Sequence, residues 1–344
     1  MLLRSCLALL AVAVPSALAS AKILIPLYSY DESCWSELTS AASANPDAQF
    51  VAILNPDSGP GDSSASDPSL YCVPYLRQQI PNIVLLGYVR TGYNERDAGE
   101  VADDVAAYRK WSSIDVSEKV EGTAGLDGIF FDESISGLED GDDLSKPETY
   151  AQTARQLLGN DSTVIFNPGT AAADRLYKAS TYVVCYESSY ADFASATLPT
   201  DSSQQAQCMI MLHTFPSDSS TLSSVVNDLA PSYGGLWISD VDIDKEDIYQ
   251  NWGSNWDEFV ADVAALSTSS SSSSDSSSSD STTSLSARST YSTVSSTSST
   301  MTNTATALVA SRTADGNSNG VTKRRAEGAA GLGVAAVLTM AVLV

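Results

Sequence analysis

The sequence is poor in histidine and in positive charge. It holds one histidine, His213, and 18 Lys and Arg residues against 42 Asp and Glu residues, for a net charge of -24 at pH 7. Because a basic footprint is missing, we expect no nucleic-acid partner. One histidine cannot form a zinc site alone, and a serine hydrolase is disfavoured because residues 21–266 contain no G-x-S-x-G motif. The excess of acid favours a cationic substrate over an anionic one.

Phosphate-binding motifs are also missing. No G-x-G-x-x-G follows the first apolar run and no Walker motif occurs, which disfavours an open, doubly wound sheet. The chain instead contains eight apolar β-type runs with helical stretches between them, at residues 22–28, 49–56, 83–90, 125–132, 163–169, 181–188, 206–215 and 234–240. Eight such units predict a single closed (β/α)8 barrel, a TIM barrel, over residues 21–266.

The two ends of the chain have the composition of targeting segments. Arg4, an apolar run and Ala17-Leu18-Ala19 predict a secretory signal peptide over residues 1–19, which is too short to be a membrane anchor. Residues 321–344 place a basic spacer before an apolar terminal tail, which predicts a GPI-attachment signal; a retained C-terminal transmembrane helix is the alternative. Either anchor would hold a secreted protein at the membrane of the cell surface, beside the cell wall.

Residues 267–320, between the barrel and the tail, are dominated by serine and threonine. Such a segment cannot bury enough apolar surface to fold, so we expect a disordered, O-glycosylated stalk. Asn160-Asp161-Ser162 is an N-glycosylation acceptor, in keeping with secretion. The sequence indicates no oligomer, and we expect a monomer.

Four cysteines remain once the one in the signal peptide is set aside: Cys34, Cys72, Cys185 and Cys208. An even number in a secreted chain indicates two disulfides. Three pairings are possible, and we favour Cys34 with Cys72 and Cys185 with Cys208.

Polar side chains gather at the carboxyl-terminal tips of the expected strands, where barrel enzymes carry their active sites. Candidates for catalysis are Asp132, Glu133 and Glu187, and candidates for substrate binding are Tyr28, Asn55, Tyr88, Arg90, Asn167, His213, Trp237 and Asp240. Carboxylates and amides can form hydrogen bonds with the hydroxyl groups of a sugar, and aromatic rings can stack on it. Two carboxyls are the groups that the cleavage of a glycosidic bond requires.

Some of these residues have a simpler interpretation. Two adjacent acids such as Asp132 and Glu133 are often the solvated start of a loop, whereas Glu187 ends a buried run and is harder to explain that way. The repeat of acids that begins at Asp240 is similar to a calcium loop. We reject calcium there because Lys245 and Asn251 occupy the positions of the turn glycine and the final glutamate.

Several motifs together resemble one known family. The runs ILIPLYSY, AILNP, LLGYVRTGY, GIFFDE, FNPG and YES occur in the order found in the spherulation-specific family 4 (spherulin 4-like) domain of fungal cell-surface proteins, over residues 22–266. The resemblance implies a (β/α)8 barrel. Some members form glycoside hydrolase family 135, which cleave galactosaminogalactan, an α-1,4-linked and partly cationic exopolysaccharide, as retaining endo-acting N-acetylgalactosaminidases. The family's acids correspond to Asp132, Glu133 and Glu187.

The three acids are not expected to share one role. Neighbouring strand residues point to opposite faces, so Asp132 and Glu133 are not expected to project alike. Our hypothesis is Asp132 as nucleophile and Glu187 as general acid/base, with Glu133 supporting them or exchanging roles with one of them. A retaining mechanism needs the two working carboxyls about 5–5.5 Å apart. No metal or organic cofactor is expected.

Two other functions are compatible with the sequence. The same mouth could bind glycan without cleaving it, as a cell-wall or matrix protein, although a lectin has no need of acids at two strand tips. The chain could also hydrolyse a different α-linked amino-sugar polymer, and nothing in the sequence separates these substrates.

Overall fold

The structure, a computed structural model, describes residues 21–272. Eight parallel strands pair in chain order and β8 pairs with β1, so the sheet is a closed barrel. The strands are β1 (Lys22–Leu27), β2 (Phe50–Leu54), β3 (Ile83–Arg90), β4 (Gly128–Asp132), β5 (Thr163–Phe166), β6 (Tyr182–Ser189), β7 (Cys208–His213) and β8 (Gly235–Ile238). The predicted (β/α)8 barrel is confirmed.

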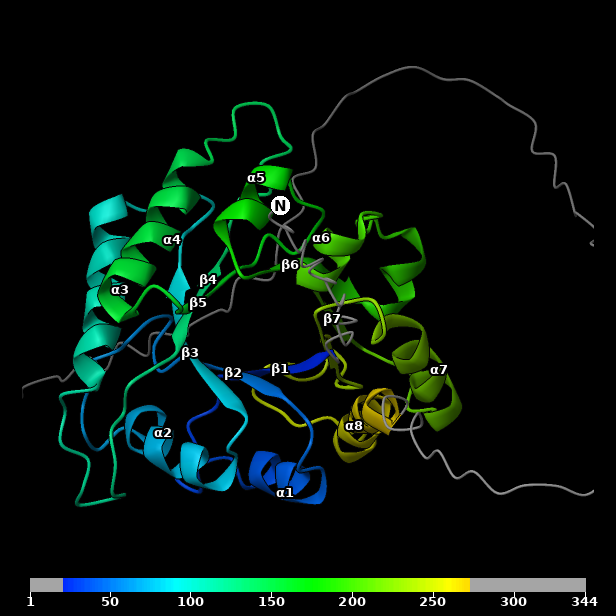
Figure 1. Cartoon of the computed structure of the whole chain (residues 1–344), viewed down its shortest axis with the longest axis horizontal. Helices are drawn as coiled ribbons and strands as arrows, with labels where there is room; N and C mark the ends of the chain where they lie inside the picture. The colour runs from blue at the N-terminus through cyan, green and yellow to red at the C-terminus, as the bar shows by residue number, and fades with distance from the viewer. Residues whose placement is uncertain (1–20, 273–344) are drawn as a thin grey trace, which may run out of the picture. The chain divides into compact units, whose positions relative to one another are not determined.

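Helices cover the outside of the strands (Figure 1). They are α1 (Ser36–Ala44), α2 (Pro68–Gln79), α3 (Ala98–Trp111), α4 (Ser145–Leu158), α5 (Asp174–Ala179), α6 (Ser202–Gln207), α7 (Ser219–Leu229) and α8 (Trp256–Ser272), with a 3-10 helix η1 (Tyr190–Ser195) after β6. The sequence did not predict α6 and η1. Neither element has a fully buried side chain, so neither shows in its sequence the periodic apolar residues by which a helix is recognised.

Strand alternation divides the core into two layers. One side chain in two faces the helices, and those between them fill the barrel interior. The interior cluster comprises Leu24, Val51, Ile53, Leu86, Tyr88, Phe130, Ile165, Val184, Met209, Met211 and Trp237, with Val241 and Ile248 from the segment after β8. Because this interior is packed with side chains, function is confined to the mouth of the barrel.

Helix α3 holds β3 in place through a close contact. Its buried face carries Val101, Val105, Tyr108 and Trp111. The Tyr108 ring lies so near β3 that a Cβ on Gly87 would come within 2.7 Å of it. The Tyr108 hydroxyl donates to the Tyr88 carbonyl oxygen at 2.9 Å. Glycine at position 87 therefore allows the packing that fixes the backbone of Tyr88.

Two disulfides join the pairs that we favoured. Cys34, before α1, is bonded to Cys72 in α2 with a Cα–Cα distance of 5.3 Å. Cys185 in β6 is bonded to Cys208, the first residue of β7, with a Cα–Cα distance of 5.4 Å. Both distances are ordinary for a disulfide.

Several predictions concern residues outside the described range. These are the signal peptide, the C-terminal anchor and all of the stalk beyond residue 272. Helix α8 continues to Ser272, so the first residues of the expected stalk are helical. Within residues 21–272 no helix combines the length and the apolar character needed to cross a membrane.

Candidate active site

Strand alternation decides which tip residues enter the mouth. On β4, Phe130 lies in the interior cluster, so Asp132, two residues later, is on the same inner side. The same spacing brings Asn167 inward after Ile165 of β5. Neighbouring strands therefore deliver a carboxylate and an amide to one point.

Glu187 reaches this point only because β6 is irregular. Val184 lies in the interior cluster, so strict alternation would turn Glu187 toward the helices. The pairing of β6 with β7 shifts between Val184 and Tyr186, which leaves Cys185 as an extra residue. Such a bulge reverses the alternation and re-aims the residues that follow it. Glu187 consequently points into the mouth.

Asn167 bridges the two acids. Its Nδ2 donates to Oδ1 of Asp132 at 2.8 Å and to Oε2 of Glu187 at 2.5 Å. Since both hydrogen bonds start from one nitrogen, these two carboxylate oxygens are at most about 5.3 Å apart. Oδ1 of Asn167 in turn accepts from the Gly169 N–H at 2.9 Å, which fixes the orientation of the amide.

Each acid also has its own tyrosine. The Tyr88 hydroxyl donates to Oδ2 of Asp132 at 2.6 Å, and the Tyr249 hydroxyl donates to Oε1 of Glu187. The ring of Tyr249 stacks on Trp237, with centroids 5.6 Å apart and planes at 27°. Tyr28 packs against both Tyr88 and Tyr249 at 5.5 Å. Aromatic rings therefore form the floor and walls around the pair of acids.

The two carboxyls differ in their electrostatics. Burial and the negative charge of Asp132 raise the pKa of Glu187 to about 7, against the opposing effect of the donors Tyr249 and Asn167. Burial also raises the pKa of Asp132, but three donors oppose it: the Tyr88 hydroxyl, the Glu133 N–H and the Asn167 amide. The pKa of both acids is therefore raised by burial, and Asp132 has three donors that stabilise its carboxylate where Glu187 has two.

Glu133 is placed differently from the other two acids. It follows the end of β4 with a φ of 51°, a left-handed conformation that is uncommon for a residue with a side chain. The Glu133 carbonyl accepts from the Tyr93 N–H at 2.6 Å and the Thr91 hydroxyl at 2.7 Å, which hold the turn. Its Oε2 accepts from Nε of Arg90 at 2.8 Å. Glu133 is thus the partner of a half-exposed arginine at the edge of the mouth.

The remaining predicted binding residues make other contacts. Oδ1 of Asn55 accepts from the Gly59 N–H at 3.1 Å, within the loop after β2. His213 is buried, which lowers its pKa, and its Nδ1 lies 2.9 Å from the Thr214 hydroxyl. Asp240 accepts from the hydroxyls of Ser217 and Ser254. The hydrogen bonds found around Asp132 and Glu187 involve none of these three side chains.

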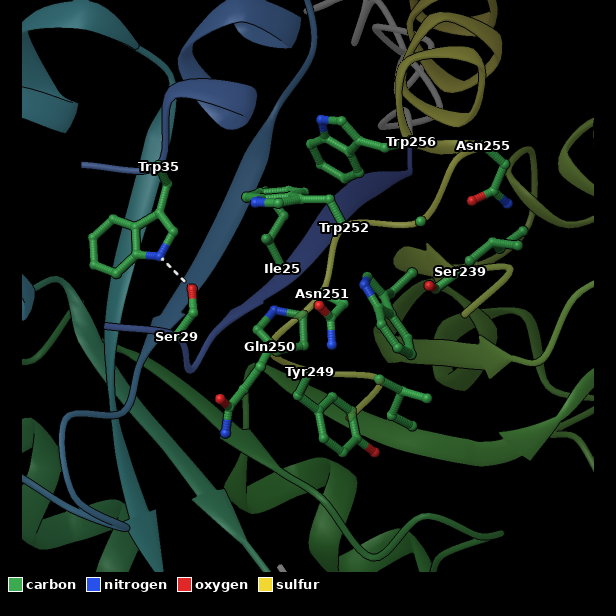
Figure 2. A pocket seen from close by; sticks show the side chains of 15 residues that line it. Ile25, Ser29, Trp35, Ser239, Tyr249, Gln250, Asn251, Trp252, Asn255 and Trp256 are labelled. Atoms are coloured by element: carbon green, nitrogen blue, oxygen red, sulfur yellow. Dashed lines mark hydrogen bonds between the residues drawn. The ribbon is translucent and has the colours of Figure 1, made fainter. Parts of the chain in front are cut away.

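Sequence reasoning missed Tyr249 because it lies on no strand. It belongs to the segment between β8 and α8, where a short aromatic stretch in polar surroundings was the only signal. Figure 2 shows Tyr249 and Trp252 on the same stretch of chain, with the Tyr249 hydroxyl pointing away from Trp252. The cavity beside it, between β1 and this segment, measures about 20 Å³ and has room for about one water molecule. It is too small for a sugar; the Tyr249 hydroxyl instead reaches Glu187 at the mouth of the barrel.

Comparisons with known proteins agree with this architecture. The family model of the spherulation-specific family 4 matches residues 22–263. Spherulin-4 of Physarum polycephalum is 28% identical over 168 residues, which are 48% of this chain and 44% of that protein, so the match spans less than half of the relative. The crystal structure of Aspergillus clavatus Sph3 in complex with GalNAc is similar with a TM-score of 0.62 and 28% identity, over 71% of this chain and 98% of that one. The chain belongs to the spherulation-specific family 4, as its motifs predicted.

Proposed function

We propose that this protein is a retaining endo-glycoside hydrolase that cleaves an α-1,4-linked amino-sugar polymer of the galactosaminogalactan type, as an endo-α-1,4-N-acetylgalactosaminidase. The observation that carries the proposal is the pair Asp132 and Glu187, joined through Asn167. Their facing oxygens are at most about 5.3 Å apart. Retaining glycosidases hold their carboxyls about 5–5.5 Å apart, whereas inverting enzymes need about 6.5–9.5 Å to admit a water molecule.

The electrostatics support one assignment of roles. Glu187, with a pKa of about 7, is the general acid that protonates the oxygen of the leaving sugar. Asp132, with three hydrogen-bond donors, is the carboxylate that attacks the anomeric carbon as the C–O bond breaks. The products of this step are a free sugar chain and a glycosyl ester on Asp132.

The same pair can complete the reaction. Once Asp132 is esterified, its negative charge is gone, and with it one cause of the raised pKa of Glu187. The ionised Glu187 then takes a proton from water, whose oxygen attacks the anomeric carbon and releases Asp132. The sugar is inverted twice, so its configuration is retained. Glu133, paired with Arg90, supports the turn after Asp132.

Two further observations support the substrate class. Sph3 of Aspergillus clavatus, which is similar over most of the barrel, was crystallised with GalNAc, an amino sugar. The net charge of -24 would concentrate a partly deacetylated, cationic polymer at the surface. Secretion and tethering through a GPI anchor or a C-terminal helix belong to the same proposal and depend on the sequence of the two ends. Asn160, the expected glycosylation site, is exposed.

The test is incubation of the full chain with purified galactosaminogalactan and mass spectrometry of released oligosaccharides. We expect fragments from the unmodified chain, and at least about a thousandfold loss of rate in Asp132→Asn and Glu187→Gln. Glu133→Gln, the matched control, is expected to lose about tenfold. If a folded, unmodified chain binds the polymer without cleaving it, the protein is a glycan-binding protein of the wall or matrix. If the protein cleaves another α-linked amino-sugar polymer faster, the proposed substrate is wrong and the proposed reaction stands.

A further inference from the structure

The exposed large apolar side chains of residues 21–272 are confined to one end of the barrel. They are Tyr30 at 70% exposure, Leu138 at 60%, Tyr93 at 52% and Ile243 at 40%. Each lies on a segment that leads from a strand into the next helix, after β1, β4, β3 and β8 respectively. Scattered exposed apolar residues need no explanation, but these four lie at the end of the barrel that carries the acids, where a bound sugar chain would meet them.

The set falls into two groups on different sides of the mouth. Strands β8 and β1 are neighbours in the closed barrel, and so are β3 and β4. The two neighbouring pairs are separated by β2 on one side and by β5, β6 and β7 on the other. Asp132 and Glu187 project into the mouth between them. Tyr93 lies within the field of the acids, and Tyr30 follows β1 near Asp67 and Tyr71, so a chain molecule that crosses the acids from β3 toward β1 would reach both rings.

Tyr93 is fixed beside the acids. It has a φ of 51° and its neighbour Asn94 a φ of 68°, conformations that cost a residue with a side chain about 1 kcal/mol or more. The Tyr93 N–H donates to the Glu133 carbonyl at 2.6 Å, which ties this strained turn to the end of β4. Partial burial raises the pKa of the phenol, and the charges of Glu133, Asp132 and Glu187 raise it further. The ring is thus exposed and within the field of all three acids.

We infer that Tyr93 and Tyr30 are stacking platforms for sugar units on the two sides of the cleaved bond, so that the substrate is a chain of several units. The inference rests on the proposed function. Tyrosine suits this use because its flat ring offers a large contact area and loses little conformational entropy on binding. The apolar C–H face of a sugar ring covers the aromatic face, and the hydroxyls remain in water.

Binding in the inactive Glu187→Gln chain tests the platforms apart from catalysis. Calorimetry would compare a disaccharide with a long oligosaccharide prepared from galactosaminogalactan. We expect Tyr93→Ala and Tyr30→Ala each to weaken binding of the long oligosaccharide about tenfold and to leave the disaccharide unchanged. Tyr93→Phe retains the ring and should bind like the parent. Tyr233→Ala is the control, because Tyr233 precedes β8 at the other end of the barrel.

The outcomes separate the inference from the function. Length-dependent loss in the two platform variants but not in Tyr233→Ala supports the platforms. Unchanged binding of the long oligosaccharide in both platform variants overturns them while leaving the hydrolase intact. If the unmodified chain neither binds nor cleaves the polymer, the proposed function fails and the platforms fail with it.

Discussion

Tyr88 and Asp132 are joined by a hydrogen bond of 2.6 Å from the phenol hydroxyl to Oδ2. Tyr249 makes the corresponding contact with Glu187, and Asn167 occupies the space between the two acids. Each carboxyl therefore has a private donor and a shared one. This arrangement allows each phenol to be removed separately, although the charge of Asp132 also acts on Glu187, so the two limbs of the pH–rate profile belong to the pair of acids.

The Tyr88→Phe variant should move the acid limb of kcat/KM. The Tyr88 hydroxyl stabilises the ionised form of Asp132, so its loss raises the pKa of the nucleophile. Because the reaction needs Asp132 ionised, the acid limb shifts to higher pH, by about one unit for a hydrogen bond to a charged group. The measurement is kcat/KM against pH. An unshifted acid limb would show that Asp132 is not the group that must be ionised.

The Tyr249→Phe variant should move the opposite limb. The Tyr249 hydroxyl lowers the pKa of Glu187, which is about 7 because burial and the charge of Asp132 outweigh this donor. Without that donor the acid keeps its proton to higher pH, so the alkaline limb moves upward from near pH 7 by about one unit. Tyr88→Phe is the matched control, because it should leave this limb in place. A fall in kcat with no movement of the alkaline limb would assign Tyr249 to packing alone.

Much of the architecture could be predicted because the same strand–helix unit repeats along the chain. Eight apolar runs separated by helical stretches predict the barrel, and the tips of regular strands identify Asp132, Asn167 and Tyr88. The alternation of side chains along β8 also explains why Asp240 lies apart from Asp132 and Glu187. Trp237 lies in the interior cluster, so Asp240, three residues later, is out of phase with it.

Other parts of the site leave no regular pattern. Glu187 points inward because β6 contains one extra residue. The alternation of apolar and polar residues in the sequence does not reveal such a single-residue bulge. Tyr249 comes from a long segment between β8 and α8, where neither alternation nor helical spacing places a side chain. The conformation of Glu133 depends on contacts with Thr91 and Tyr93, which precede it by forty residues or so. These features depend on tertiary contacts that local sequence does not encode.

Stability should depend on pH through Glu187. Its pKa is 4.5 when unperturbed and about 7 in the folded protein, so between these values the folded state binds the proton more tightly than the unfolded state. The free energy of unfolding therefore falls as pH rises from 4.5 to 7, by up to about 3 kcal/mol. Glu187→Gln removes this contribution. Chemical denaturation at several pH values should show the two proteins converging in acid, with the variant gaining relative stability toward neutral pH. Parallel curves would mean that the carboxyl is not raised by the fold.

The disulfide between Cys185 and Cys208 should matter for catalysis as well as for stability. Cys185 is the extra residue of the bulge that turns Glu187 inward, and its partner is the first residue of the neighbouring strand. Fixing the bulge to β7 opposes a slip of register that would reverse Glu187.

A double variant, Cys185→Ala with Cys208→Ala, tests this role. We expect a loss of about 3 kcal/mol in the free energy of unfolding, from the closed loop, and at least about a tenfold fall in kcat at temperatures where the variant is folded. The matched control is Cys34→Ala with Cys72→Ala. That bond closes a longer loop, of 38 residues against 23, and neither of its cysteines lies on a strand with an acid. The control should lose comparable stability and keep its kcat. An equal fall in kcat in both double variants would mean that the bond stabilises the barrel in general and does not aim Glu187.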